Sequence, residues 1–185
     1  MIKFNKAFFE RSKKYPRLVF IDQKIKEERQ VGPNILLTRV DNRLVHGQVG
    51  VTWVKSLGAN LIVVVDDVAA NSDVEKQLME VVAKSSGVGI RFFTIEHTIN
   101  IIHKASPNQK IFIVCKTPET VKKLVDGGVP IKEVNIGNMH FSEGKEQLSK
   151  KVYVDQKDRD DIKYLESKGV DIYIQDVPGD KKLKV

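Results

Sequence analysis

The chain has little of several features that mark common protein classes. Its single cysteine, Cys115, excludes an internal disulfide framework, and because it ends an apolar run it is predicted to be a buried strand residue. No apolar run approaches the roughly 20 residues that cross a bilayer, and Leu61 to Val65 is typical of the longest. The four histidines lack metal-ligand spacing, so we expect no bound metal. Neither G-x-G-x-x-G nor G-x-x-x-x-G-K-[ST] occurs, which leaves a nucleotide-binding domain weakly supported.

The net charge of +7 is unevenly distributed along the chain. Residues 1–32 hold nine Lys/Arg and four Asp/Glu, whereas the remainder holds 22 and 20. The larger part is therefore close to neutral, and it lacks a basic stripe interleaved with aromatic residues, which argues against a nucleic-acid partner. With 41% hydrophobic and 30% charged residues, the composition is that of a soluble globular protein.

Residues 1–32 are interpreted as an N-terminal extension whose origin the sequence leaves open. The extension lacks the apolar core and small-residue cleavage site of a secretory signal. A short strand at 18–21 and a polar helical turn at 24–30 are expected within it. Two explanations compete: a real extension that packs on the following domain, or a start codon upstream of a native one near Val31. The second explanation is favoured.

Residues 33–185 alternate between strand and helix patterns in the manner of one α/β domain. Strands are predicted at 35–37, 61–65, 90–94, 111–115, 134–136, 152–154 and 171–174, with helices at 49–57, 72–85, 95–105, 117–125 and 156–168. This order predicts a single doubly wound, mainly parallel open sheet flanked by helices. In the second helix the apolar residues predicted to face inward are Val74, Leu78, Val81 and Val82, with Asn71 or Ser72 as the N-cap.

The loop from Arg39 to Gln48 lies between the first strand and the first helix and carries the most chemistry. His46 occupies the strand-to-helix turn, with Gly47 after it and Arg43 three residues before it. Such turns, at the carboxyl ends of strands, are where open α/β sheets bind ligands, and the N–H groups of a helix start favour anions. An imidazole there can attack a phosphoryl group whose oxygens Arg43 holds. On position alone, a helix cap or a surface histidine stays an open alternative.

The sequence around His46, R-V-D-N-R-L-V-H-G-Q-V, resembles the active-site loop of IIB components of the mannose/sorbose family of the bacterial phosphotransferase system (PTS). Those proteins carry a version of R-I-D-D-R-L-I-H-G-Q-V in which the histidine is phosphorylated. The resemblance covers about residues 33–185. Residues 60–71 resemble the family's second strand and the turn that follows it. The segments 89–96, 134–145 and 174–180 resemble most the branch that handles N-acetylgalactosamine or galactosamine. That branch also has Asn where this chain has Asn42 and many other relatives have Asp.

The resemblance implies a cytoplasmic phosphocarrier that acts as a protein-phosphohistidine–sugar phosphotransferase. It would accept phosphate from a IIA protein on His46, through the δ nitrogen, and pass it to a sugar at a membrane permease of IIC and IID components, with which it associates peripherally. No cofactor is required, because the donor is already a phosphohistidine. N-acetylgalactosamine or galactosamine is the expected sugar, ahead of mannose or sorbose. A homo-oligomer stays open.

Several neighbours of His46 are predicted to support the phosphoryl group or a partner. Asp41 could orient Arg43 or accept an imidazole N–H, or it could be a simple turn residue. The remaining candidates for phosphate binding or support are Asn42, Gly47, Gln48, Asp67 and Thr117. The loop predicted to face a partner contains Gly137, Asn138 and His140. The other histidines, His97 and His103, are predicted to lie on the solvated side of a helix.

A receiver-like regulatory domain, phosphorylated on Asp66 or Asp67, is the alternative function. Both residues end a predicted buried strand, where an acceptor carboxylate could lie. Receivers, however, carry the acceptor on the third strand and an acidic pair after the first. Here the first strand leads to the Arg/His loop instead, which favours the histidine phosphocarrier.

Overall fold

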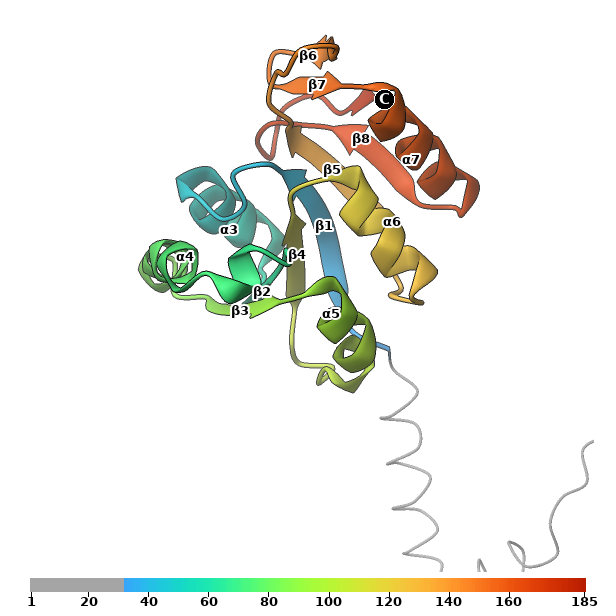
Figure 1. Cartoon of the computed structure of the whole chain (residues 1–185). Helices are drawn as coiled ribbons and strands as arrows, with labels where there is room; N and C mark the ends of the chain where they lie inside the picture. Colours follow the sequence, from blue (N-terminus) through green and yellow to red (C-terminus); the bar gives the residue numbers. More distant parts are fainter. Residues whose placement is uncertain (1–31) are drawn as a thin grey trace, which may run out of the picture. The chain divides into compact units, whose positions relative to one another are not determined.

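The computed structural model describes residues 32–185, in which a seven-stranded sheet lies between two layers of helices (Figure 1). The expectations for residues 1–31, a strand at 18–21, a turn at 24–30 and the origin of the extension, lie outside the described residues. Residues 33–185 form one compact unit.

The sheet is built from short apolar strands, most of them buried on both faces. In spatial order they are β3 (Gly89–Phe93), β2 (Leu61–Val65), β4 (Ile111–Cys115), β1 (Ile35–Asp41), β5 (Glu133–Asn138), β8 (Asp171–Ile174) and β9 (Leu183–Lys184). All neighbours are parallel except β8 and β9. Continuous apolar runs such as β2 and β4 are typical of parallel strands covered on both sides. The predicted doubly wound, mainly parallel sheet is confirmed.

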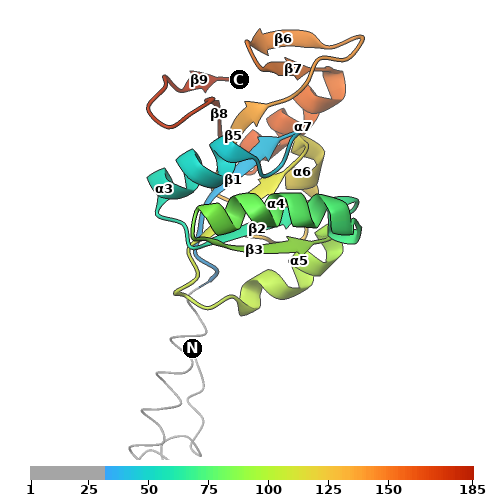
Figure 2. The ribbon, with the colours of Figure 1, turned by 90° about the vertical axis from the view of Figure 1, so that its left-hand side faces the viewer.

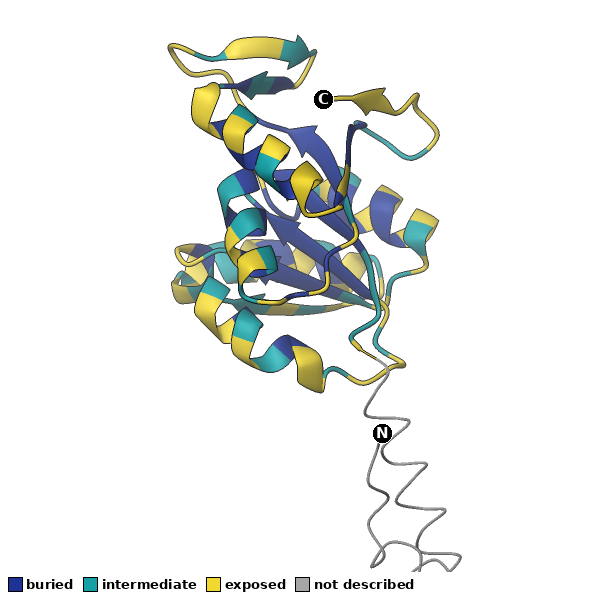
Figure 3. Cartoon of the chain, turned by 90° about the vertical axis from the view of Figure 1, so that its right-hand side faces the viewer, coloured by how far each residue is buried: buried dark blue, intermediate teal, exposed yellow. Residues whose placement is uncertain are grey.

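Two sets of helices cover the two faces of the sheet (Figures 2 and 3). The first face packs against α5 (Ile95–Ile101), the short η3 (Ile102–Lys104), α6 (Pro118–Asp126) and α7 (Gln156–Ser167). The second packs against η1 (Gln48–Trp53), which continues into α3 (Val54–Leu57), and against α4 (Asp73–Ser85), which follows the short η2 (Ala69–Asn71). Because β1 is the central strand, the loop that follows it lies at the middle of one sheet edge.

Helix α4 begins as predicted but presents a different face to the core. Ser72 is the N-cap, its hydroxyl accepting from the Glu75 N–H at 3.3 Å. The prediction that Val74, Leu78 and Val81 point inward is wrong, since they are 70%, 66% and 68% exposed.

The buried side of α4 is made by Met79 and Ala83, with Val82 half-buried between α4 and η1. Val82 lies against the backbone of Gly50, where a β carbon on the glycine would overlap the valine side chain. Helix α4 packs so closely against η1 that the side facing the core holds small or flexible side chains. The stripe that is richest in branched apolar residues faces solvent instead.

The segment from Gly137 to His140 differs from the predicted partner-facing loop. Strand β5 continues through Gly137 and Asn138, which are buried, so these two residues are not part of an exposed partner-facing loop. His140 is exposed. An antiparallel hairpin follows, in which β7 (Val152–Val154) is the strand predicted at 152–154 and β6 (Glu146–Ser149) was not predicted. Across residues 32–185, no helix combines the length and apolar character that a membrane crossing needs.

Candidate active site

The turn after β1 holds His46 directly in front of a helix. The Leu44 N–H donates to the Asp41 carbonyl at 2.9 Å, and the Gly50 N–H donates to the His46 carbonyl at 2.8 Å, which begins η1. Leu44 has φ 55, a left-handed conformation that costs a bulky residue about 1–2 kcal/mol, and its side chain is only 2% exposed. A buried leucine therefore anchors the strained turn, and such strain is typical of functional loops.

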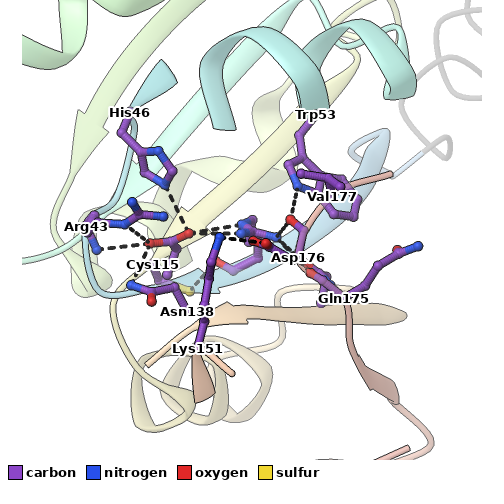
Figure 4. A network of polar contacts seen from close by, with 12 residues as sticks. Arg43, His46, Trp53, Cys115, Asn138, Lys151, Gln175, Asp176 and Val177 are labelled. Atoms are coloured by element: carbon purple, nitrogen blue, oxygen red, sulfur yellow. Dashed lines mark hydrogen bonds and ion pairs between the residues drawn. The ribbon is translucent and has the colours of Figure 1, made fainter. Parts of the chain in front are cut away.

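His46 belongs to a network of polar contacts (Figure 4), and the contacts of His46, Arg39 and Arg43 meet at Asp41. Its Oδ2 lies 3.2 Å from His46 Nε2 and 3.0 Å from Arg39 Nη2. Its Oδ1 accepts from the Arg43 N–H at 3.1 Å and lies 3.5 Å from Arg43 Nε. Asp41 therefore makes both the turn contact and the imidazole contact that the sequence suggested. Because Nε2 faces Asp41, Nδ1 is the ring nitrogen left to face a ligand.

Arg39 is the functional candidate that reasoning from sequence missed. Its side chain is 0% exposed, and besides Asp41 its guanidinium donates to Asn135 Oδ1 and to the carbonyls of Gln175 at 3.2 Å and Asp176 at 3.4 Å. The guanidinium also lies 5.1 Å from the centre of the Trp53 ring. A signal was available: residues two apart on a strand share a face, so two opposite charges in an apolar strand predict a buried pair.

The network keeps its carboxylate ionised despite burial. Burial alone would raise the pKa of Asp41, but the hydrogen bond from His46 and the charge of Arg39 lower it from 3.8 to about 2. Burial lowers the pKa of Arg39 from 12.5, with Asp41 opposing that effect, and a guanidinium stays protonated at physiological pH. An ionised Asp41 can only accept hydrogen bonds, so the Nε2 atom of His46 is the donor in their contact.

Asn42 joins the active loop to its two neighbours at the sheet edge. Its Nδ2 donates to the Lys116 carbonyl at 2.9 Å, and its Oδ1 accepts from the His140 N–H at 2.5 Å. The loops after β4 and β5 therefore emerge beside the His46 loop, as expected for neighbouring parallel strands. Thr117 caps α6, its hydroxyl accepting from the Thr120 N–H at 3.3 Å, and it follows the residue that Asn42 contacts. Asn42 is a tether between loops.

The two aspartates after β2 are engaged elsewhere. Asp66 Oδ1 accepts from the Ala69 N–H at 2.8 Å and lies 3.1 Å from Lys116 Nζ. The exposed Asp67 accepts from the Ile95 N–H at 2.9 Å. Ile95 begins α5, which follows β3, the strand that β2 separates from β4 and β1. The structure thus gives Asp67 a helix-capping contact in place of the expected support for phosphate near His46, because β2 is separated from β1 by β4.

The remaining candidates border the helix start. Gly47 is exposed, and Gln48 is half-buried in the first turn of η1. Arg43 leaves 41% of its side chain exposed beside the 21% exposed ring of His46. Asn138, from β5, points its Nδ2 at Asp41 Oδ1, 3.5 Å away. Within residues 32–185 no cluster of three or more His, Cys, Asp or Glu is arranged to hold a metal ion.

Fold and site together define an α/β domain with a partly exposed histidine at the carboxyl edge of a parallel sheet, backed by a buried Asp–Arg pair. Residues 35–185 match the family model of the PTS system sorbose subfamily IIB component. The chain belongs to this family, as the resemblance of its loop implied. IIB components are phosphotransferases, so the chain is a transferase of the phosphotransferase system.

Relatives of known name agree with this family. The N-acetylgalactosamine-specific phosphotransferase enzyme IIB component 1 of Escherichia coli is 63% identical over 153 residues, which are 83% of this chain and 97% of the relative. Its crystal structure superposes with a TM-score of 0.81, covering 82% of this chain and 99% of that one. The IIBSor domain of the sorbose permease from Klebsiella pneumoniae is 31% identical with a TM-score of 0.75, covering 81% and 92%.

Proposed function

We propose that this chain is a cytoplasmic phosphocarrier that accepts a phosphoryl group from a IIA protein on His46 Nδ1. It then delivers that group to a sugar at the IIC/IID permease. The observation that carries the proposal is the contact of His46 Nε2 with the ionised Asp41, which leaves the Nδ1 lone pair directed away from the buried network. Arg43, exposed beside the ring, supplies the cation for the phosphoryl oxygens.

The first transfer exchanges one N–P bond for another. The Nδ1 lone pair of His46 forms the new N–P bond while the bond from phosphorus to the donor histidine breaks, and its electron pair returns to that imidazole. As His46 donates its lone pair, positive charge develops on the ring. The Asp41 carboxylate, 3.2 Å from Nε2, stabilises that charge without having to reorient. In the second step a sugar hydroxyl oxygen forms the new O–P bond while the bond from phosphorus to His46 Nδ1 breaks. Its electron pair returns to the His46 ring, and the hydroxyl proton passes to solvent.

The names of the relatives support the choice of sugar. Two curated relatives, 63% and 47% identical, are named N-acetylgalactosamine-specific, whereas the mannose-specific relative is 35% identical. We therefore assign N-acetylgalactosamine, with galactosamine second. Membrane vesicles that contain the cognate IIC and IID should phosphorylate labelled N-acetylgalactosamine only when this protein is added back. Phosphorylation of mannose alone would refute the sugar and leave the phosphocarrier role intact.

Labelling tests the phosphorylated residue directly. The full-length protein is incubated with the general PTS proteins, the cognate IIA and phosphoenolpyruvate, and the labelled peptide is identified by mass spectrometry. His46→Ala should abolish the label, whereas His103→Ala, which removes an exposed histidine on η3, should not. Undiminished labelling of His46→Ala would sink the proposal.

The same experiment discriminates the receiver alternative. A phosphohistidine is labile in acid and survives alkali, whereas an aspartyl phosphate is lost in alkali. Family membership and the existing contacts of Asp66 and Asp67 both disfavour an aspartyl phosphate. Label that is lost in alkali, and that disappears in Asp66→Asn or Asp67→Asn, would support the receiver function instead.

A further inference from the structure

We propose that Arg39 is a positioning residue that sets the tautomer of His46 by way of Asp41. The proposal deepens the proposed function, since it assigns the reactive state of the same histidine to a group that never touches the phosphoryl group. Arg39 and Asp41 lie on one face of the central strand, and His46 contacts the same Oδ2 atom that the guanidinium binds.

The guanidinium is held on all sides, so its position is defined by the fold. Asn135 lies opposite Arg39 in the register of β1 and β5, and the carbonyls of Gln175 and Asp176 approach from the end of β8. The Trp53 ring covers it from η1, and the Trp53 Nε1–H donates to the Asp176 carbonyl at 3.1 Å. Groups from β5, from the end of β8 and from η1 therefore direct the Arg39 guanidinium at Asp41.

Gly137 also helps to position the Arg39 guanidinium. A β carbon at Gly137 would overlap the Arg39 guanidinium, so the backbone of β5 comes this close to the charge only because the residue has no side chain. Gly137 was predicted to belong to a partner-facing loop, but it lies in β5, and its backbone packs against the Arg39 guanidinium. Substitution there displaces the guanidinium without removing its charge from the chain.

The consequence for His46 follows from what a carboxyl group can donate. An ionised Asp41 only accepts, which requires Nε2–H on His46 and leaves the lone pair on Nδ1. A buried carboxyl group that lost its cation would have its pKa raised by burial. Once protonated, it would donate to Nε2 and place the imidazole proton on Nδ1, where it blocks attack. Arg39 therefore keeps Nδ1 of His46 unprotonated by keeping Asp41 ionised, although Asp41 contacts the other ring nitrogen, Nε2.

Other charged groups near the pair do not replace Arg39. Arg43 and His46 face Asp41 from the loop, and both are partly exposed. Asp176 faces Arg39 from the end of β8 and is paired with Lys151 of the β6–β7 turn at 2.6 Å. Cys115 of β4, whose pKa is raised by burial, contacts the Arg39 carbonyl through its thiol. Of these, Arg39 is the fully buried cation on Oδ2.

The test reads the tautomer and the rate separately in the full-length protein. Long-range ¹H–¹⁵N spectra of His46 should show the Nε2–H form in wild type, and Nδ1–H in the wild type would overturn the proposal outright. Arg39→Met and Gly137→Ala should lose the Nε2–H preference and slow phosphotransfer about tenfold or more near neutral pH. Their rates should recover as pH rises and Asp41 ionises. Arg39→Lys keeps the charge and should retain the Nε2–H tautomer.

Matched controls separate this role from loss of fold. Arg91→Met and Gly89→Ala change exposed residues of the edge strand β3 and should alter neither the spectra nor the rate. If a folded Arg39→Met or Gly137→Ala protein keeps the wild-type tautomer and pH profile, Arg39 is merely structural and the proposal fails. If the tautomer responds as stated while wild-type His46 is never labelled, the proposed function fails and the assignment of Arg39 stands.

Discussion

Two regions of the domain reverse the usual distribution of side chains, in opposite directions. At the end of β1, Arg39 and Asp41 are charged and 0% exposed. On α4, the apolar Val74, Leu78 and Val81 are each at least 66% exposed. The charged pair is tolerated inside because every part of it is hydrogen-bonded, and leaving such a group unpaired would cost several kcal/mol. The comparison shows that hydrophobicity alone does not determine which residues of this domain are buried. The formation of all hydrogen bonds of a charged pair, and close packing between helices, also determine it.

The largest effect should follow from breaking the buried pair. Asp41→Asn leaves the Arg39 guanidinium without its counter-charge, so we expect the free energy of unfolding to fall by about 3–5 kcal/mol. Urea denaturation measures it. Asp171→Asn, at an exposed carboxylate that begins β8, should change stability by no more than about 0.5 kcal/mol. Equal effects of the two variants would mean that the buried pair has no special cost.

A second effect should distinguish the two sides of α4. Met79 is 5% exposed, and Met79→Ala should lower the free energy of unfolding by about 2–5 kcal/mol through the cavity that it leaves. Leu78→Ala, one residue earlier, should cost at most about 0.5 kcal/mol. Thermal and urea unfolding of both variants measure the contrast. A larger loss for Leu78→Ala would restore the inward face that the sequence alone suggested.

The free energy of unfolding should fall in acid as Asp41 becomes protonated. Its pKa is about 2 in the fold against an ordinary value of 3.8, so it binds fewer protons when folded than when unfolded. The stability from this group is fully present above about pH 4 and is lost as pH falls through 2, roughly 2 kcal/mol in all. Urea unfolding at several pH values, for wild type and Asp41→Asn, should show the gap between them shrinking by that amount. A gap that stays constant would contradict it.

The smallest effect on stability should come from the exposed end of the network. Arg43→Lys keeps the charge but loses the planar fork, so phosphotransfer should slow in both directions. The free energy of unfolding should change by no more than about 0.5 kcal/mol, because 41% of the Arg43 side chain is exposed. Single-turnover labelling and melting curves measure the two quantities. A variant that melts much earlier yet transfers normally would make Arg43 a structural residue.

Much of the fold and the position of the site could be predicted from local sequence. Apolar runs such as 61–65 and 111–115 became β2 and β4, and Ser72 and Thr117 became helix caps. The strand-to-helix turn placed His46 at the sheet edge, since parallel topology puts such turns together. These features depend on periodicity, turn chemistry and chain direction, which neighbouring residues encode.

Only the tertiary structure decided the contacts between distant segments. Helical spacing allows more than one apolar stripe on α4, and the approach of Gly50 to Val82 selected the side that faces inward. Asp67 lies next to Asp66 in the chain, yet its carboxylate accepts a hydrogen bond from the Ile95 N–H at the start of α5. The sequence by itself determined the strands, the loop and its histidine. The state of that histidine depends on Arg39 and Gly137, 98 residues apart, because burial and complete hydrogen bonding are properties of the assembled sheet.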